Sequence, residues 1–175
     1  MYTQVYFHDV RRVYDLHLKE FLEAWLPGGK FPSDWNALLA ISDHEILTGM
    51  RSAAAVRGNA NHELARRVLA RRHFRTVYEL VSVHKRKRPT ILRDLLNAAT
   101  SEFGVENIRS DAYGPKSETN NFLVQTDDRG VESSLLVSGV IANVPAVEIG
   151  LIFASAGIAA DAKRWIDRKL RELLN

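Results

Sequence analysis

The spacing of apolar residues changes once along this chain, near residue 104, and that change constrains the fold more than any other feature. Before it, apolar side chains recur three and four residues apart, which is typical of helices with one buried face. After it, short runs rich in β-branched and aromatic residues indicate strands. We therefore expect an α+β protein, with a mainly helical part over residues 1–103 and a small α+β subdomain over 104–175.

The first part is expected to contain about five helices. They are expected up to Trp25, around 35–39, from 43 to about 57, over 62–83 as one or two helices, and over 90–103. Pro27 and Gly28 stop the first helix. Ser42 and Glu45 stand three residues apart and predict a capping box at the start of the third. Gly104 is expected to end the last.

The second part is expected to form a small three-stranded sheet, antiparallel or mixed, and a C-terminal helix. Strands are predicted at 105–113, 121–126 and 147–154. The last of these is mainly apolar and rich in residues that favour strands, which indicates a buried strand. The C-terminal helix is predicted over 156–174, and we expect helices to cover one face of the sheet.

Positive charge is concentrated between Arg66 and Arg88. This window holds nine Lys and Arg residues and one acid, Glu79, so its net charge is +8, whereas that of the whole chain is +3. Such asymmetry favours a polyanionic partner, either nucleic acid or a phosphate-rich ligand. The alternative is a solvated helical face followed by a basic loop over 85–89. Besides Arg71 and Arg75, this basic patch comprises Arg66, Arg67, Arg72, Lys85, Arg86, Lys87 and Arg88.

Composition and motifs exclude several kinds of chemistry. The chain has no cysteine, which rules out disulfides, thiol nucleophiles and thiolate metal sites. It has no phosphate-binding glycine loop and no serine nucleophile elbow. Neither His8-Asp9 nor 43–45 has the spacing of a helical metal site, so we expect no catalytic residue, metal or cofactor in this chain. No apolar run approaches the roughly 18–20 residues that span a bilayer; we expect no membrane partner and, by default, a cytoplasmic location.

Three segments, in this order, resemble the HD-domain metal-dependent phosphohydrolases, a group that includes dNTP triphosphohydrolases. They are Tyr-x-x-Val-Tyr-Phe-His at 2–8, Ser-Asp-His-Glu-Ile-Leu at 42–47 and Arg-Arg-x-Phe-Arg-Thr-Val-Tyr-Glu at 71–79. The likeness is strongest over residues 1–83 and looser beyond Thr90. It implies a region that follows the catalytic core of such an enzyme, whose metal ligands have no counterpart here. The divalent metal would then belong to the absent HD core.

The resemblance also implies nucleotide contacts for four residues. Tyr6 falls where a tyrosine lines the nucleotide pocket, although it could instead pack in the helical core. His8 falls in a Tyr-x-His-Lys stretch, and here Asp9 replaces the usual lysine, which removes a positive charge. Arg71 and Arg75 fall where, in some members, an arginine and a lysine contact a regulatory nucleotide at a subunit interface. Arginine at the lysine position keeps the charge but presents a planar fork of donors.

The leading hypothesis is that this chain is the C-terminal structural or regulatory region of an HD-domain nucleotide phosphohydrolase, as a fragment or a truncated gene product. It would be inactive alone, and its parent would be a metal-dependent phosphohydrolase. Its expected partners are a nucleotide or other phosphate ligand, further copies of itself, or the missing N-terminal HD core. Two alternatives remain: a nucleic-acid-binding module that uses the basic 66–88 segment, and a purely structural oligomerisation domain.

Overall fold

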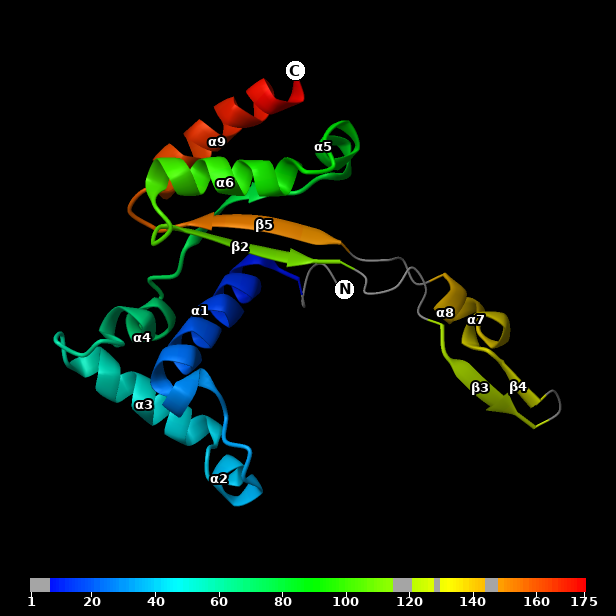
Figure 1. The fold of residues 1–175 in the computed structure, drawn as a ribbon, viewed down its shortest axis with the longest axis horizontal. Helices are drawn as coiled ribbons and strands as arrows, with labels where there is room; N and C mark the ends of the chain where they lie inside the picture. The colour runs from blue at the N-terminus through cyan, green and yellow to red at the C-terminus, as the bar shows by residue number, and fades with distance from the viewer. Residues whose placement is uncertain (1–6, 115–120, 128–129, 144–147) are drawn as a thin grey trace. The chain divides into compact units, whose positions relative to one another are not determined.

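The fold is α+β, with a three-stranded antiparallel sheet, a separate two-stranded sheet and a C-terminal helix (Figure 1). The structure is a computed structural model, and it describes residues 7–114, 121–127, 130–143 and 148–175. The chain divides into two compact units, Met1–Asp111 with Leu151–Asn175, and Ala112–Gly150. The larger unit therefore draws on both sides of residue 103, where the sequence predicted a boundary.

The first helices of the larger unit form a group with its own apolar core. They are α1 (Asp9–Trp25), the single turn η2 (Pro27–Gly29), α2 (Trp35–Leu39), α3 (Asp43–Ala55) and α4 (His62–Leu69). Phe21, Met50, Ala53 and Ala65 are buried together where α1, α3 and α4 meet. The capping box predicted at Ser42 is confirmed. The Ser42 side chain accepts a hydrogen bond from the backbone of Glu45, and the Glu45 side chain accepts one from the backbone of Ser42.

The three-stranded sheet has the order β1-β5-β2 and joins segments that are far apart in sequence. Its strands are β1 (Arg75–Glu79), β2 (Ile108–Tyr113) and β5 (Ile149–Ala154), and β1 pairs antiparallel with β5 from Arg75 opposite Ala154 to Glu79 opposite Leu151. The helices α6 (Ile91–Phe103) and α9 (Ala159–Leu174) cover one face (Figure 1). The short helix α5 (Ser82–Lys87) links β1 to α6.

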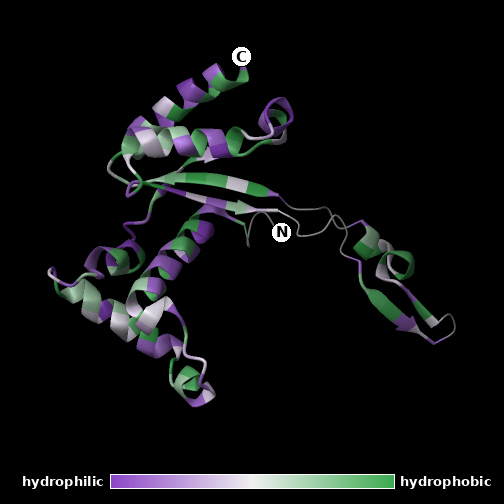
Figure 2. Ribbon diagram, in the orientation of Figure 1, coloured by the Kyte–Doolittle hydropathy of each residue, from purple (hydrophilic) through white to green (hydrophobic). Residues whose placement is uncertain are grey.

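The sequence predicted a buried strand at β5, and the structure shows it buried on both faces. Ile152 and Ala154 belong to the core beneath α6 and α9. Leu151 and Phe153 alternate with them, so they point to the opposite face of the sheet, where α1 packs against β1. Figure 2 shows β5 as mainly hydrophobic and α5 as mainly hydrophilic. The central position of β5 explains why it has no polar face.

The prediction of helix over residues 62–83 is wrong for 75–79, which form β1. This segment is rich in β-branched and aromatic residues, and its pairing partner β5 lies more than 70 residues further along the chain, where no local pattern reveals it. Val77 and Tyr78 are buried as expected, but from a strand. The basic loop expected at 85–89 is also wrong in part, because helix α5 extends to Lys87.

The smaller unit consists of a β-hairpin and two short helices: β3 (Leu123–Thr126), β4 (Gly130–Ser133), α7 (Ser134–Val137) and α8 (Gly139–Ala142). The strand predicted at 121–126 is confirmed, but it pairs with β4 rather than with the three-stranded sheet. Across the parts of the chain that the structure describes, no helix has both the length and the apolar character to cross a membrane.

Gly104 ends α6 with φ +85°, in the region that favours glycine. We expect Gly104→Ala to lower the free energy of unfolding by about 1–2 kcal/mol, because a side chain at this φ strains the backbone. Gly157→Ala is the matched control, since a Cβ there meets open space and its φ is not positive. Urea unfolding of both variants measures the difference; equal stabilities would show that Gly104 is not needed to end the helix.

Candidate functional site

Residues 70–75 run from the C-cap of α4 to the first residue of β1, and we call them the arginine loop because they carry three of the cations singled out in the sequence. Arg71, Arg72 and Arg75 are exposed, whereas His73 and Phe74 between them are buried. Arg71 adopts a φ of +53°, the one positive φ at a non-glycine residue within the described chain. The loop therefore turns sharply after α4, with its arginines on the exposed side and with His73 and Phe74 on the buried side.

His17 of α1 fixes the backbone at the inner end of the arginine loop. The Phe74 amide N–H donates to His17 Nε2 at 3.1 Å, and the imidazole is fully buried. Because Nε2 accepts, the proton of the neutral ring is assigned to Nδ1, which lies 3.2 Å from Glu20 Oε2 and donates to it. A chain of hydrogen bonds thus runs from the loop backbone through His17 to the Glu20 carboxylate.

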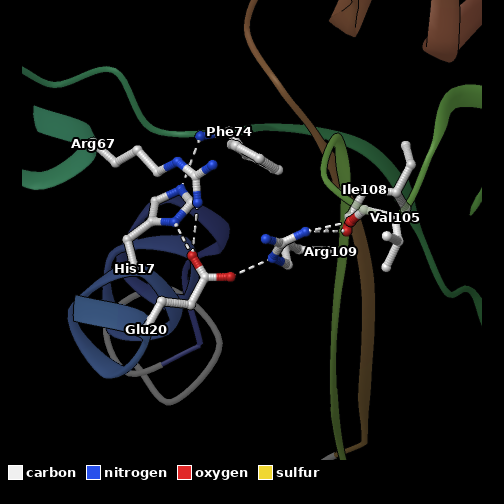
Figure 3. A network of polar contacts seen from close by, with 7 residues as sticks. All are labelled: His17, Glu20, Arg67, Phe74, Val105, Ile108 and Arg109. Carbon is white, nitrogen blue, oxygen red and sulfur yellow. Dashed lines mark hydrogen bonds and ion pairs between the residues drawn. The ribbon is translucent and has the colours of Figure 1, made fainter. Parts of the chain in front are cut away.

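Glu20 is the centre of this network, which Figure 3 shows from close by. Arg67 of α4 donates from Nη1 to Glu20 Oε2 at 2.9 Å. Arg109 of β2 donates from Nε to the other carboxylate oxygen, and its Nη1 also donates to the carbonyls of Val105 and Ile108 at 2.6 and 2.8 Å. One carboxylate on α1 therefore connects the helical group to the sheet.

The ring of Phe74 lies beside both arginines that bind Glu20. The Arg67 guanidinium carbon is 4.8 Å from the ring centroid and that of Arg109 is 5.4 Å away. The His17 ring meets Phe74 edge-on, with centroids 5.0 Å apart. Cations over an aromatic ring are attracted by its quadrupole. Phe74 thus stabilises the two guanidinium groups while it fills the space beneath the arginine loop.

The pKa of Glu20 is set by opposing effects of burial and positive charge. Burial by itself raises this pKa, but hydrogen bonds from His17 and Arg109, together with the charges of Arg109 and Arg67, outweigh it and lower the pKa to about 2. The carboxylate is therefore ionised at neutral pH. Every oxygen of Glu20 is engaged by a donor, so the network holds structure together and offers no free base for catalysis.

His73 occupies a second buried position beneath the arginine loop. Its side chain is 7% exposed, its Nε2 accepts from Arg75 Nη1 at 2.8 Å, and its ring lies 4.8 Å from that of Tyr14. Burial, and next the charge of Arg75, lower the pKa of His73, so the ring is neutral at neutral pH. Arg75 is thereby held at the start of β1 with its backbone in the sheet.

The start of α1 does not join this network directly. His8 is the N-cap of α1, with Nδ1 3.3 Å from the Val10 N–H, and its side chain is exposed. Tyr6, the other residue expected in a nucleotide pocket, lies outside the described residues. Asp9 accepts a hydrogen bond from Thr76 Oγ1 at 2.5 Å, which attaches the first turn of α1 to β1.

A second ion pair joins α1 to the sheet beside the network. Arg12 donates to both carboxylate oxygens of Asp111, one from Nε and the other from Nη2 at 2.8 Å. The hydrogen bond to Asp111 raises the pKa of Arg12 against the opposing effect of burial. This bidentate pair sits on partly buried side chains, so it reinforces the attachment of α1 to β2.

The basic patch expected over 66–88 does not form one helical face. Arg66 lies 3.8 Å from Glu63, Arg67 belongs to the network, and Arg88 binds Asp94 at 2.6 Å. The remaining exposed cations lie at opposite ends of β1, which spans about 13 Å. They are Arg71, Arg72 and Arg75 at one end, and Arg86 and Lys87 on α5 at the other.

Three residues of the network were not singled out in the sequence: His17, Glu20 and Arg109. His17 lies on the apolar face of the first helix, three residues after Tyr14 and four before Phe21. A polar side chain in that position is a signal that could have been recognised. Glu20 and Arg109 come together across 89 residues, and no local pattern indicates that pairing.

The described residues hold no group of three His, Asp or Glu side chains arranged to bind a metal ion. What the arrangement offers chemically is a rigidly anchored loop with outward guanidinium groups, suited to bind an anion.

Comparisons with known proteins identify the fold but no family. Neither the comparison with protein-family models nor that with curated proteins finds a match. Among solved structures, one described as a hypothetical protein from Aquifex aeolicus is similar, with a TM-score of 0.70 and 23% sequence identity. The similarity covers 94% of this chain and 41% of that chain, so this chain spans about two-fifths of its length. At this identity the likeness shows the fold alone.

Proposed function

We propose that this chain is the C-terminal structural and regulatory region of an HD-domain nucleotide phosphohydrolase, and that it contacts a nucleotide or other phosphate ligand through Arg71 and Arg75. The observation that carries the ligand contact is the arginine loop, whose backbone is held by His17 at Phe74 while Arg71, Arg72 and Arg75 are exposed residues. The catalytic metal would belong to an HD core outside this chain. A cytoplasmic location and self-association into a homo-oligomer are part of the proposal.

The positive charges of Arg71 and Arg72 support the proposed contact with a phosphate ligand. Neither Arg71 nor Arg72 forms a side-chain hydrogen bond or ion pair within the part of the chain that is described. Arginine presents a planar fork of donors that matches phosphate oxygens, and a fixed loop loses little freedom when it binds. Arg75 is already oriented by its contact with His73.

Two further observations support the HD-enzyme context. The three family-like segments occur in the family's order over residues 2–79. A similar fold also forms part of a longer chain in the Aquifex structure, of which it covers 41%. A region of this kind would act by supporting a neighbouring core, and the ionised Glu20 network gives it the internal rigidity to do so.

The nucleic-acid-binding alternative is weaker because the exposed cations lie in two groups separated by β1. An oligonucleotide would have to extend along the strand to reach both, whereas a mononucleotide needs only the arginine loop. Nucleic-acid binding would also weaken steeply as salt increases.

Thermal unfolding with dNTPs, GTP and ATP tests the ligand contact. We expect a nucleotide near 100 times its dissociation constant to stabilise the fold by about 2.7 kcal/mol, which raises the melting temperature by several degrees. Arg71→Ala and Arg75→Ala should abolish that rise. Alanine and arginine are equally strained at the φ of residue 71, so this variant removes the guanidinium without changing the backbone penalty.

Arg51→Ala is the matched control, because Arg51 is exposed on α3 away from the arginine loop and should leave the rise intact. No rise with any mononucleotide, or a rise that persists in both loop variants, would overturn the ligand contact. A rise with oligonucleotides alone would favour the nucleic-acid module. Hydrolysis of dNTPs by this chain with Mg²⁺ or Mn²⁺ would overturn the proposal that catalysis belongs to a separate core.

A further inference from the structure

A groove of about 600 Å³ lies in the larger unit, away from the arginine loop. It lies between the end of α1, most of the length of α3 and the segment that joins α3 to α4. The side chains that matter for its chemistry are Trp25, His44, Thr48, Ser52, Asn59 and Asn61. Its volume falls within the range of small-molecule sites, roughly 300–1,000 Å³.

Gly49 shapes this groove by admitting the indole of Trp25. A Cβ at residue 49 would lie 2.7 Å from Trp25 Cε2, closer than two carbons can approach, so only glycine lets the ring rest against α3. The Trp25 ring stacks on Phe21, with centroids 6.0 Å apart and planes 17° apart. The indole is therefore held firmly, and it gives the groove an apolar wall.

The polar side chains of the groove are available to a ligand. Thr48 and Ser52 are four residues apart on α3 and so share one face. Neither hydroxyl, nor the His44 ring, has a hydrogen-bond partner within the described residues. Asn59 Oδ1 accepts from the Asn61 backbone N–H at 2.8 Å, which leaves both side-chain amide groups as donors toward solvent.

The charges of the groove select against an anion. Among the described residues that line it there is no lysine or arginine, and the one carboxylate, Glu45, accepts from the Ser42 N–H at 3.0 Å. A phosphate would meet that negative charge with no cation to balance it. Hydroxyl groups, by contrast, both donate and accept, and so match a set of hydroxyls and amides beside an aromatic ring.

We propose that this groove binds a neutral polyhydroxylated ring, supplied either by a free saccharide or by the ribose of a nucleoside. The ring packs against the part of Trp25 that lines the groove, and its hydroxyls bond Thr48, Ser52 and the amide of Asn61. This site is independent of the phosphate contact proposed for the arginine loop, because the two share no residue and the groove takes no charge.

Nuclear magnetic resonance of the indole N–H groups tests this proposal directly. The chain has three tryptophans, and loss of one signal in Trp25→Phe identifies the groove. Glucose, maltose and trehalose form one arm, and unphosphorylated adenosine and guanosine form the other, each at about 10 mM so that millimolar binding is visible. We expect one arm to shift the Trp25 signal in a saturable way, and the arm that does so identifies the source of the ring.

Ser52→Phe fills the groove from an exposed position on α3, and we expect it to weaken binding by at least about tenfold, or 1.4 kcal/mol. Thr48→Val, which removes one hydroxyl at nearly constant volume, should weaken it less. Ser101→Phe is the matched control, an exposed serine on α6 whose replacement should change nothing. The site would be overturned if neither the saccharides nor the nucleosides shifted the Trp25 signal, or if the shift were as large in Ser52→Phe as in the wild-type chain. Arg71→Ala should leave this binding unchanged, so the groove and the phosphate contact at the arginine loop can be refuted independently.

Discussion

Glu20→Gln is expected to lower the free energy of unfolding by about 2 kcal/mol at neutral pH. The substitution keeps the shape of the side chain but leaves Arg67 and Arg109 without their shared counter-charge. Arg109 retains the carbonyls of Val105 and Ile108, whereas Arg67 loses its one carboxylate partner among the described residues and retains the ring of Phe74. A partly buried cation that loses its partner keeps its desolvation cost, which is why one charge has a large effect. Urea unfolding followed by circular dichroism measures it.

Glu23→Gln is the control for this change. Glu23 lies on the same helix, but its pair with Lys19 spans 3.7 Å between exposed side chains. Exposed pairs of this kind contribute at most about 0.5 kcal/mol. If the two variants were equally stable, the network at Glu20 would contribute no more than a surface ion pair, and its role in joining α1 to the sheet would be refuted.

The wild-type chain and Glu20→Gln should also differ in how their free energy of unfolding depends on pH. The pKa of Glu20 is lowered from an ordinary 4.5 to about 2 in the folded chain. Its contribution is therefore complete above about pH 5 and is lost as the pH falls from 4.5 towards 2. At pH 3 the stability difference between the wild-type chain and Glu20→Gln should be less than about half its value at pH 7. A difference that stays constant across this range would contradict the low pKa.

Phe74→Ala is expected to cost about 3–4 kcal/mol of unfolding free energy. The ring is 3% exposed and contacts His17 and both guanidinium groups, so its removal leaves a cavity and ends two cation–π contacts. Because the Phe74 N–H still donates to His17, the loop backbone should remain in place. Urea unfolding gives the magnitude, and retained far-ultraviolet circular dichroism shows that the fold persists.

Two further variants separate the causes of that loss. Phe74→Leu keeps most of the apolar volume and removes the aromatic quadrupole, so we expect about 1–2 kcal/mol. Phe31→Ala, at a side chain that is 47% exposed, should cost less than about 1 kcal/mol. A cost for Phe74→Ala as small as that for Phe31→Ala would show that the buried ring does not support the arginine loop.

Much of the local structure was predictable because it depends on neighbours in sequence. The capping box at Ser42, the glycine end at Gly104 and the buried strand β5 are all confirmed. Each follows from a short-range rule about caps, permitted φ values or apolar runs. The strand β1 was missed because Val77 and Tyr78 have apolar spacing that suits either a helix or a strand, and only pairing with β5 decides between them.

The candidate site was predictable only in part. The sequence singled out Arg71 and Arg75 through charge and resemblance, and the structure places both on the exposed side of one loop. It could not indicate that Arg67, from the same basic run, turns inward to Glu20. Charge density along a sequence reports how many cations are present. Whether each side chain points inward or toward solvent depends on which carboxylates the fold brings near it.

By itself, the sequence determined the α+β class, most helix boundaries, the buried strand and the concentration of positive charge, because propensity, capping and periodicity act over a few residues. Only the tertiary structure decided which cations face solvent and which are neutralised. Glu20 meets Arg67 across 47 residues and Arg109 across 89. Contacts of that length depend on how the helical group packs against the sheet. The hydrogen bonds and positive charges that they bring to Glu20 lower its pKa against the effect of burial, while the same packing fixes His17 and leaves the arginine loop exposed.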